Sequence, residues 1–283
     1  MKRTLTGLSL FTILFGFILL TGVEAKGIKI GQFVFDAIVL FFAAASSYEI
    51  YKVFKSKEYN PTFIPVIVFL AAVYPLIYFF GFTGYAAAAG SALFSAFGFF
   101  IFDGRIKIHD FLCTLLMLIY PVFALSLSFW LTVNFGMIPL LIAVGAAMCS
   151  DTMAFYMGSL IKGPKIFPKI SPKKTYSGSA FGIVGGILGS ILVYLLFELA
   201  NLPLNDAFRV TEQIKYPILF YILMGAAIGV ISEIGDLAAS RLKRELQIKD
   251  FSKAFGSHGG IMDRLDSILF AVVFMAIVMA FVG

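Results

Sequence analysis

Charged residues are scarce in this chain of 283 residues, of which they form 13%, whereas hydrophobic residues form 60%. With a mean hydropathy of +0.96, this composition excludes an ordinary soluble globular domain. Phenylalanine and glycine are abundant instead, at 33 and 26 residues, as is typical of packed transmembrane helices. We therefore expect an all-α, polytopic integral membrane protein with about nine transmembrane helices and a polar cavity that faces the cytoplasm.

Cysteine and histidine are also rare, with two residues of each. Cys113 and Cys149 lie in or beside apolar runs at no spacing that a metal site would use, so we interpret them as small core residues. A lone histidine is more often structural than catalytic. His109, at the start of an apolar run, is expected at the membrane interface, whereas His258 lies in a polar segment near the C-terminus.

The apolar runs are separated by short polar joints. The expected spans cover about residues 1–23, 33–50, 63–80, 83–102, 111–129, 132–148, 180–199, 217–234 and 268–282. The first run begins with basic residues and ends near small ones, so a cleaved signal peptide is the alternative to a first span. We divide the chain into N-terminal helices (1–110), a middle region with a basic loop at 150–179 (111–200), and a C-terminal region with the polar segment 240–266 (201–283).

Lysine and arginine are distributed unevenly among the polar joints. If the N-terminus is cytoplasmic, most of the 22 basic residues fall on the cytoplasmic side, which is the positive-inside pattern. The net charge of +6 therefore reflects membrane topology, and we expect no nucleic-acid partner. We expect a multi-pass protein of the cytoplasmic (inner) membrane, with its active site facing the cytoplasm.

The polar segment from Ser240 to Asp266 collects many ionisable side chains between two apolar runs. A charged side chain at the bilayer centre costs roughly 2.5–3.5 kcal/mol, so these groups must face water, a cavity or a ligand. The glycine pair Gly259–Gly260 allows the backbone to approach another group closely. The alternative is a solvated cytoplasmic loop.

Two pairs of carboxylates stand near this segment, Glu233 with Asp236 and Asp263 with Asp266. The members of each pair are three residues apart, so they share a face if the chain is helical there. Four crowded carboxylates would repel one another, and Mg²⁺ would relieve this by binding their oxygens together with phosphate oxygens. Ion pairs would account for the same charges without metal, and the candidate cations are Arg241, Lys243, Arg244 and Arg264.

A second candidate site lies in the basic loop, where residues 165–175 combine lysines, hydroxyls and prolines. Lysine offers a compact charge for phosphate, and serine and threonine hydroxyls can donate to phosphate oxygens. The alternative is a juxtamembrane segment attracted to anionic lipid, worth about 1 kcal/mol per cation. Elsewhere, Asp36 and Glu49 are intramembrane or edge carboxylates that either line the cavity or form structural pairs.

The order of the polar residues near the C-terminus resembles the signature of the phosphatidate cytidylyltransferase (CDP-diacylglycerol synthase) family. The matching residues are Ser240, Lys243, Arg244, Lys249, Asp250, His258, Gly259, Gly260, Asp263, Arg264 and Asp266. The basic loop is similar to that family's other characteristic region, through Ser150, Asp151, Ala154, Ser171, Lys173, Lys174, Thr175 and Ser179. Ser177 departs from the pattern, because an acidic residue often stands there.

The resemblance implies an enzyme that converts CTP and phosphatidic acid to CDP-diacylglycerol and pyrophosphate. It implies Mg²⁺ as cofactor, with a monovalent cation as a further candidate, membrane lipids around the protein, and a homodimer. The catalytic residues implied are Asp236, Lys243, Arg244, Asp263, Arg264 and Asp266, with Asp236, Asp263 and Asp266 as metal ligands. The substrate-binding residues implied are Asp151, Ser171, Lys173, Lys174, Thr175, Ser240, Lys249, His258, Gly259 and Gly260.

Three other functions compete with this interpretation. A CTP-dependent polyprenol or lipid kinase would transfer the γ-phosphoryl group, and a relative acting on an ether-lipid phosphate would differ only in its acceptor. A non-enzymatic membrane transporter would place charges near the bilayer midplane, often with inverted repeats. Here the charges gather near the span ends on one side, which disfavours a transporter.

Overall fold

A computed structural model describes residues 30–200, 202, 204, 209–254, 256 and 259–282. Within these residues the regular structure is helical, and the only β pairing is an isolated antiparallel bridge between Lys165 and Thr175. This confirms the all-α class. The expected first span, residues 1–23, lies outside the described residues.

Seven helical elements of the described chain are long and apolar enough to cross a membrane, which confirms a polytopic membrane protein. They are α2 (Ile30–Ser56), α3 (Ile64–Phe102), the continuous α4, η1 and α5 (Ile108–Met117, Leu118–Phe123 and Ala124–Phe135), α6 (Ile138–Ile161), α7 with η2 (Tyr176–Val193 and Tyr194–Leu199), α9 (Pro217–Glu245) and α10 (Met262–Val282). The short α8 (Val210–Gln213) precedes α9.

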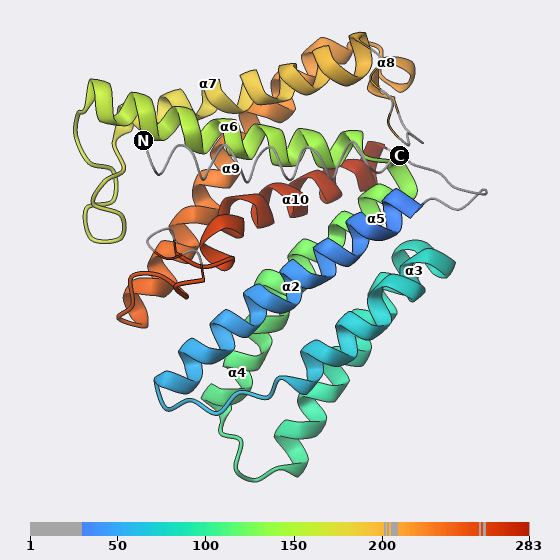
Figure 1. The fold of residues 1–283 in the computed structure, drawn as a ribbon, viewed down its shortest axis with the longest axis vertical. Coiled ribbons are helices and arrows are strands. Elements are labelled where there is room, and N and C mark those ends of the chain that lie inside the picture. The colour runs from blue at the N-terminus through green and yellow to red at the C-terminus, as the bar shows by residue number, and fades with distance from the viewer. Residues whose placement is uncertain are drawn as a thin grey trace.

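The long element α3 is broken at Gly81, which has φ 58° and ψ −134°. The rings of Phe69 and Tyr85 lie 6.0 Å apart between centroids. A straight helix would separate those residues by roughly 24 Å, so the chain must reverse between them. Figure 1 shows the two arms of α3 running back along each other. The expected spans 63–80 and 83–102 are therefore the arms of a helical hairpin, and the total of nine spans stays a prediction.

Three helices extend into segments that were predicted to be loops. Helix α6 continues to Ile161 instead of ending near residue 148, and α9 continues to Glu245 instead of ending near 234. Helix α10 begins at Met262 instead of near 268. The connection predicted at 150–179 is correspondingly confined to 162–175. Polar side chains in the extended turns contact other parts of the protein, for example Asp151 and Lys243. These contacts stabilise the three helices beyond the apolar residues that mark a membrane span.

Helices α6 and α7 lie side by side, α9 crosses them, and α10 lies between this group and α2, α3, α4 and α5 (Figure 1). Glycine allows the backbones of α7 and α9 to approach each other closely. A Cβ added at Gly186 would lie 2.3 Å from the carbonyl oxygen of Gly225, and one added at Gly225 would lie 2.6 Å from that of Gly186. Small residues at such contacts are typical of packed transmembrane helices.

Candidate active site

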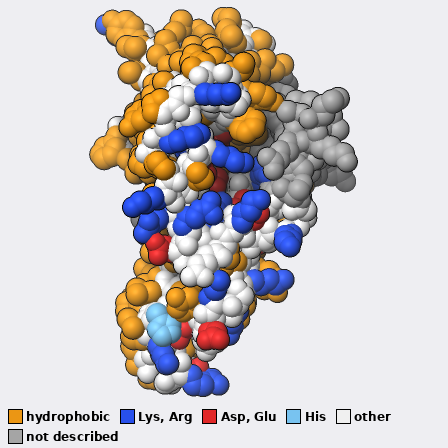
Figure 2. Space-filling view, turned by 90° about the vertical axis from the view of Figure 1, so that its left-hand side faces the viewer, with side chains coloured by type: hydrophobic (Ala, Val, Ile, Leu, Met, Phe, Trp, Pro, Cys, Tyr) orange, Lys and Arg blue, Asp and Glu red, His pale blue; other side chains and the backbone are white. Residues whose placement is uncertain are grey.

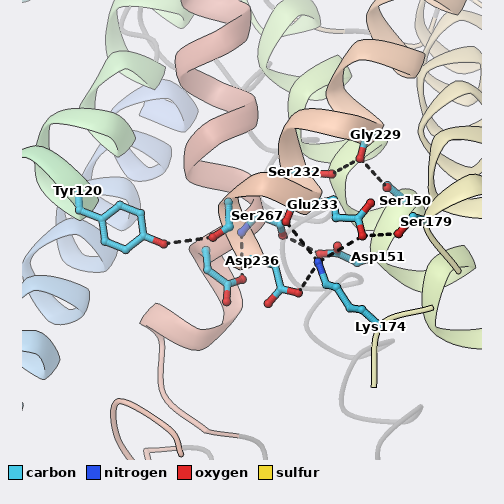
Figure 3. A network of polar contacts seen from close by, with 12 residues as sticks. Tyr120, Ser150, Asp151, Lys174, Ser179, Gly229, Ser232, Glu233, Asp236 and Ser267 are labelled. Atoms are coloured by element: carbon cyan, nitrogen blue, oxygen red, sulfur yellow. Dashed lines mark hydrogen bonds and ion pairs between the residues drawn. The ribbon is translucent and has the colours of Figure 1, made fainter. Parts of the chain in front are cut away.

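Carboxylates from helices α6 and α9 gather around the side chain of Lys174 (Figure 3). Asp151 comes from α6, and Glu233 and Asp236 come from α9. Asp263 and Asp266 lie in the first two turns of α10, where the next residue, Ser267, contacts Asp151. The two carboxylate pairs predicted from the spacing therefore do lie on helices. Figure 2 shows lysine and arginine side chains on the same face of the molecule, around acidic side chains that are visible between them.

Lys174 joins the basic loop to helix α9. Its Nζ lies 2.9 Å from Oδ2 of Asp236 and 3.7 Å from Oε1 of Glu233, and it donates a 3.2 Å hydrogen bond to the Glu233 carbonyl oxygen. Ser179, on the first turn of α7, donates from its hydroxyl to the Glu233 carboxylate. The structure thus brings together the two polar regions of the sequence, more than fifty residues apart.

Helices α6 and α10 are linked by Ser267. Its hydroxyl donates a 2.6 Å hydrogen bond to Oδ2 of Asp151, and its backbone N–H donates to Oδ1 of Asp266 at 2.9 Å. The Asp266 side chain is buried. Ser267 was not predicted as a site residue, and its position directly after Asp266 was the only available signal. Nearby, the Ser150 hydroxyl donates to the Gly229 carbonyl oxygen at 3.4 Å and connects α6 to α9.

A second ion pair connects α9 to the start of α10. Nζ of Lys243 lies 2.7 Å from Oδ1 of Asp263, and both side chains are largely buried. The other oxygen, Oδ2, accepts the N–H groups of Phe251 and Gly260 at 2.9 and 3.0 Å. Both oxygens of Asp263 are therefore engaged by the protein. Removing one partner of such a buried pair typically costs about 3–5 kcal/mol, because a charge is left uncompensated.

Tyr120 approaches the site from the π-helical segment η1 and was not predicted. Pro121 lies within this segment and lacks the N–H that a regular helix would use, which accounts for the local π geometry. The Tyr120 hydroxyl donates to the carbonyl oxygen of Gly235 at 3.5 Å, and its ring packs edge-on against Phe270. A proline inside an apolar run was the only sequence signal for this bend.

The other predicted site residues differ in their burial and in their contacts. Thr175 is buried and caps α7, since its hydroxyl accepts the Gly178 N–H at 3.1 Å. Arg244 donates to the Ile170 carbonyl oxygen at 3.3 Å, on the basic loop. The remaining residues are the exposed Lys173, Lys249 and Arg264, the half-buried Ser171 and Ser240, and the buried Gly259 and Gly260. His258 lies outside the described residues.

The donor set suits a hard cation, because carboxylate oxygens are what Mg²⁺ prefers. No three Asp, Glu, His or Cys side chains of the described residues converge as a metal-binding group. Lysines instead contact two of the three predicted ligands, Asp236 and Asp263. In proteins Mg²⁺ is commonly bound by one or two carboxylates together with oxygens of a substrate phosphate. The carboxylates of this site fit Mg²⁺ in that way, with the remaining oxygens supplied by a bound phosphate.

Comparison with known proteins identifies the family of the chain. The chain is 35% identical over 79 residues to the phosphatidate cytidylyltransferase of Bacillus subtilis (strain 168), which is 28% of this chain and 29% of that protein. It is 38% identical over 66 residues to the enzyme of that name from Aquifex aeolicus (strain VF5), covering 23% of this chain and 26% of the relative. These matches span under a third of each relative's length. The model of the cytidylyltransferase family, however, matches residues 1–282, and the chain therefore belongs to that family.

Proposed function

We propose that this protein is a phosphatidate cytidylyltransferase, which converts CTP and phosphatidic acid to CDP-diacylglycerol and pyrophosphate. The observation that carries the proposal is the contact of Lys174 with Asp236 and Glu233, beside Asp151, which Ser267 links to Asp266. A lysine, a residue type suited to binding phosphate, therefore lies among several carboxylates in a polytopic membrane protein. The family membership and the names of the relatives support the same activity.

In this reaction, a phosphate oxygen of phosphatidic acid attacks the α-phosphorus of CTP in line. The bond from that phosphorus to the β-phosphate bridging oxygen breaks, and pyrophosphate leaves. The nucleophile is already an anion, so little general-base catalysis is needed. No activated side-chain nucleophile is part of the described site, and the proposal contains no covalent enzyme intermediate.

The chain's own residues bind and orient the phosphates. Lys174 and Lys243 lie at the carboxylates and are placed to move from them to phosphate oxygens. Asp236 and Asp266 are the better-placed metal ligands, because Asp263 has both oxygens engaged by Lys243 and by backbone N–H groups. When bound, Mg²⁺ would neutralise the phosphates and the departing pyrophosphate.

The proposed site serves two substrates with different origins. CTP is soluble and enters from the cytoplasm, while phosphatidic acid enters sideways from the inner leaflet. The cytoplasmic orientation follows from the distribution of lysine and arginine, and the inner membrane of the cell is the proposed location. The homodimer implied by the family resemblance belongs to the same proposal.

Labelled CTP tests the reaction directly. The purified protein in detergent receives phosphatidic acid, Mg²⁺ and CTP labelled on either the α- or the γ-phosphate. Cytidylyl transfer puts the α-label into lipid and releases the γ-label as pyrophosphate. Entry of the γ-label into lipid would establish a lipid kinase instead, and absence of both transfers in folded protein would contradict the proposed phosphatidate cytidylyltransferase.

A further inference from the structure

Glu49 of helix α2 reaches the far end of the polar segment, more than two hundred residues away in sequence. Its Oε1 accepts the Ile261 N–H at 3.0 Å and the Ser252 hydroxyl at 2.5 Å. Its Oε2 accepts the Met262 N–H at 2.9 Å. The side chain is buried, so these contacts are made away from bulk water.

These contacts satisfy the start of helix α10, which begins at Met262. The first N–H groups of a helix have no partner within the helix, and a carboxylate beside them is favoured by the helix dipole as well as by the hydrogen bonds. Such partners usually come from the residue just before the helix. Here the partner is Glu49 of helix α2, and its two carboxylate oxygens accept the successive N–H groups of Ile261 and Met262. This geometry fixes the direction in which α10 begins.

The glycine pair of the polar segment fits between two carboxylates. A Cβ added at Gly260 would lie 2.3 Å from Oε2 of Glu49, a distance that no side chain tolerates without movement. Gly259 has φ +81°, and a Cβ there would lie 3.0 Å from Oδ2 of Asp263. Gly260 therefore leaves the space that the Glu49 carboxylate needs in order to reach α10.

We propose that Glu49 is the positioning residue of the active site, which holds the first turns of α10 in register with α6 and α9. Those turns carry Asp263, which contacts Lys243, and Asp266 with Ser267, which contacts Asp151. Glu49 itself contacts backbone N–H groups and a hydroxyl, and it acts through α10. The consequence for catalysis rests on the proposed function, whereas the consequence for α10 stands independently of it.

Amide hydrogen exchange tests the structural half in the full-length protein in detergent. We compare the wild type with Glu49→Ala and with the matched control Asp36→Asn, which alters another buried carboxylate of α2. The partners of Asp36 are Gln32 of the same helix and Tyr74 of α3, and neither belongs to α10. Loss of hydrogen bonds to a charged group should raise exchange in peptides covering 259–265 by about tenfold or more. The control should leave those peptides unchanged. Unchanged exchange in Glu49→Ala overturns the proposal.

A double-mutant cycle tests the functional half through the rate of α-label transfer. Gly260→Ala and Glu49→Ala should each lower the rate by about tenfold or more, the first by collision with the carboxylate and the second by its removal. In the double variant the collision is absent, so its rate should be no lower than that of Glu49→Ala alone. Fully additive losses would overturn the proposal. If the wild type transfers no label at all, the proposed function fails, while the exchange experiment still decides the role of Glu49 at α10.

Discussion

Nζ of Lys174 lies 2.9 Å from Oδ2 of Asp236, so a lysine from the basic loop serves as the counter-ion of a carboxylate on α9. Its side chain is only 19% exposed. A solvated loop attracted to anionic lipid, the alternative interpretation of this segment, would present its lysines outward. The contact instead ties the loop to the candidate site.

Replacement of Lys174 tests this link. Lys174→Met removes the proposed phosphate ligand and leaves Asp236 and Glu233 without their described cation, so we expect the transfer rate to fall about 100-fold or more. Lys169→Met changes an exposed lysine of the same loop and should stay within about twofold of the wild type. Equal effects of the two substitutions would show that only the overall charge of the loop matters.

Removal of Asp263 should affect both stability and activity. Asp263→Ala leaves Lys243 buried without its partner, and we expect the free energy of unfolding to fall by about 3–5 kcal/mol and transfer to be lost, while the protein still inserts into the membrane. Thermal unfolding in detergent and the labelled-CTP assay measure the two effects. Glu245→Ala breaks an exposed i,i+4 pair with Arg241 and should cost no more than about 1 kcal/mol. An active Asp263→Ala protein would remove this residue from the catalytic set.

Chelation distinguishes the metal from the purely ionic interpretation of the carboxylates. Excess EDTA should abolish transfer, and Mg²⁺ should restore it, whereas Ca²⁺ should restore less because it prefers longer bonds and a larger, more flexible coordination shell. Retention of full activity in EDTA would indicate that Lys174 and Lys243 alone balance the charges.

The glycine contact between α7 and α9 should govern stability. Gly186→Ala puts a methyl group 2.3 Å from the Gly225 carbonyl oxygen, and overpacking of this kind typically costs about 1–3 kcal/mol or more. At roughly 2–4 °C per kcal/mol, the melting temperature should fall by several degrees. Gly90→Ala, where an added Cβ meets nothing within 4 Å, is the matched control and should leave the melting temperature unchanged.

The sequence predicted the helical class and the shared faces of the carboxylate pairs, because hydropathy and i,i+3 spacing are local properties. The predicted C-terminal ends of α6 and α9 and the predicted start of α10 were wrong. The polar turns there are stabilised by contacts such as Lys243–Asp263, which a hydropathy pattern does not contain. Ser171, Lys173 and His258 remain predictions from the family resemblance. The substrate role of Thr175 is likewise a prediction from the resemblance, and the structure adds that its hydroxyl caps α7, a position that threonine favours.

The role of Glu49 could not be predicted from sequence, since no local pattern connects α2 to Ile261 and Met262. From the sequence, two roles were open for this carboxylate: it lines a cavity, or it forms a structural pair. The structure gives it backbone N–H groups and a hydroxyl as partners. Long-range contacts to backbone carry no signature in residue type, so only the folded chain identifies them.

The backbones of α7 and α9 are in direct contact at Gly186 and Gly225, and no side chain separates them there. Neither helix can slide or rotate past the other without a collision between backbone atoms. The two helices are therefore expected to move as one unit, together with the contact that they share in the candidate site, from Ser179 on α7 to Glu233 on α9.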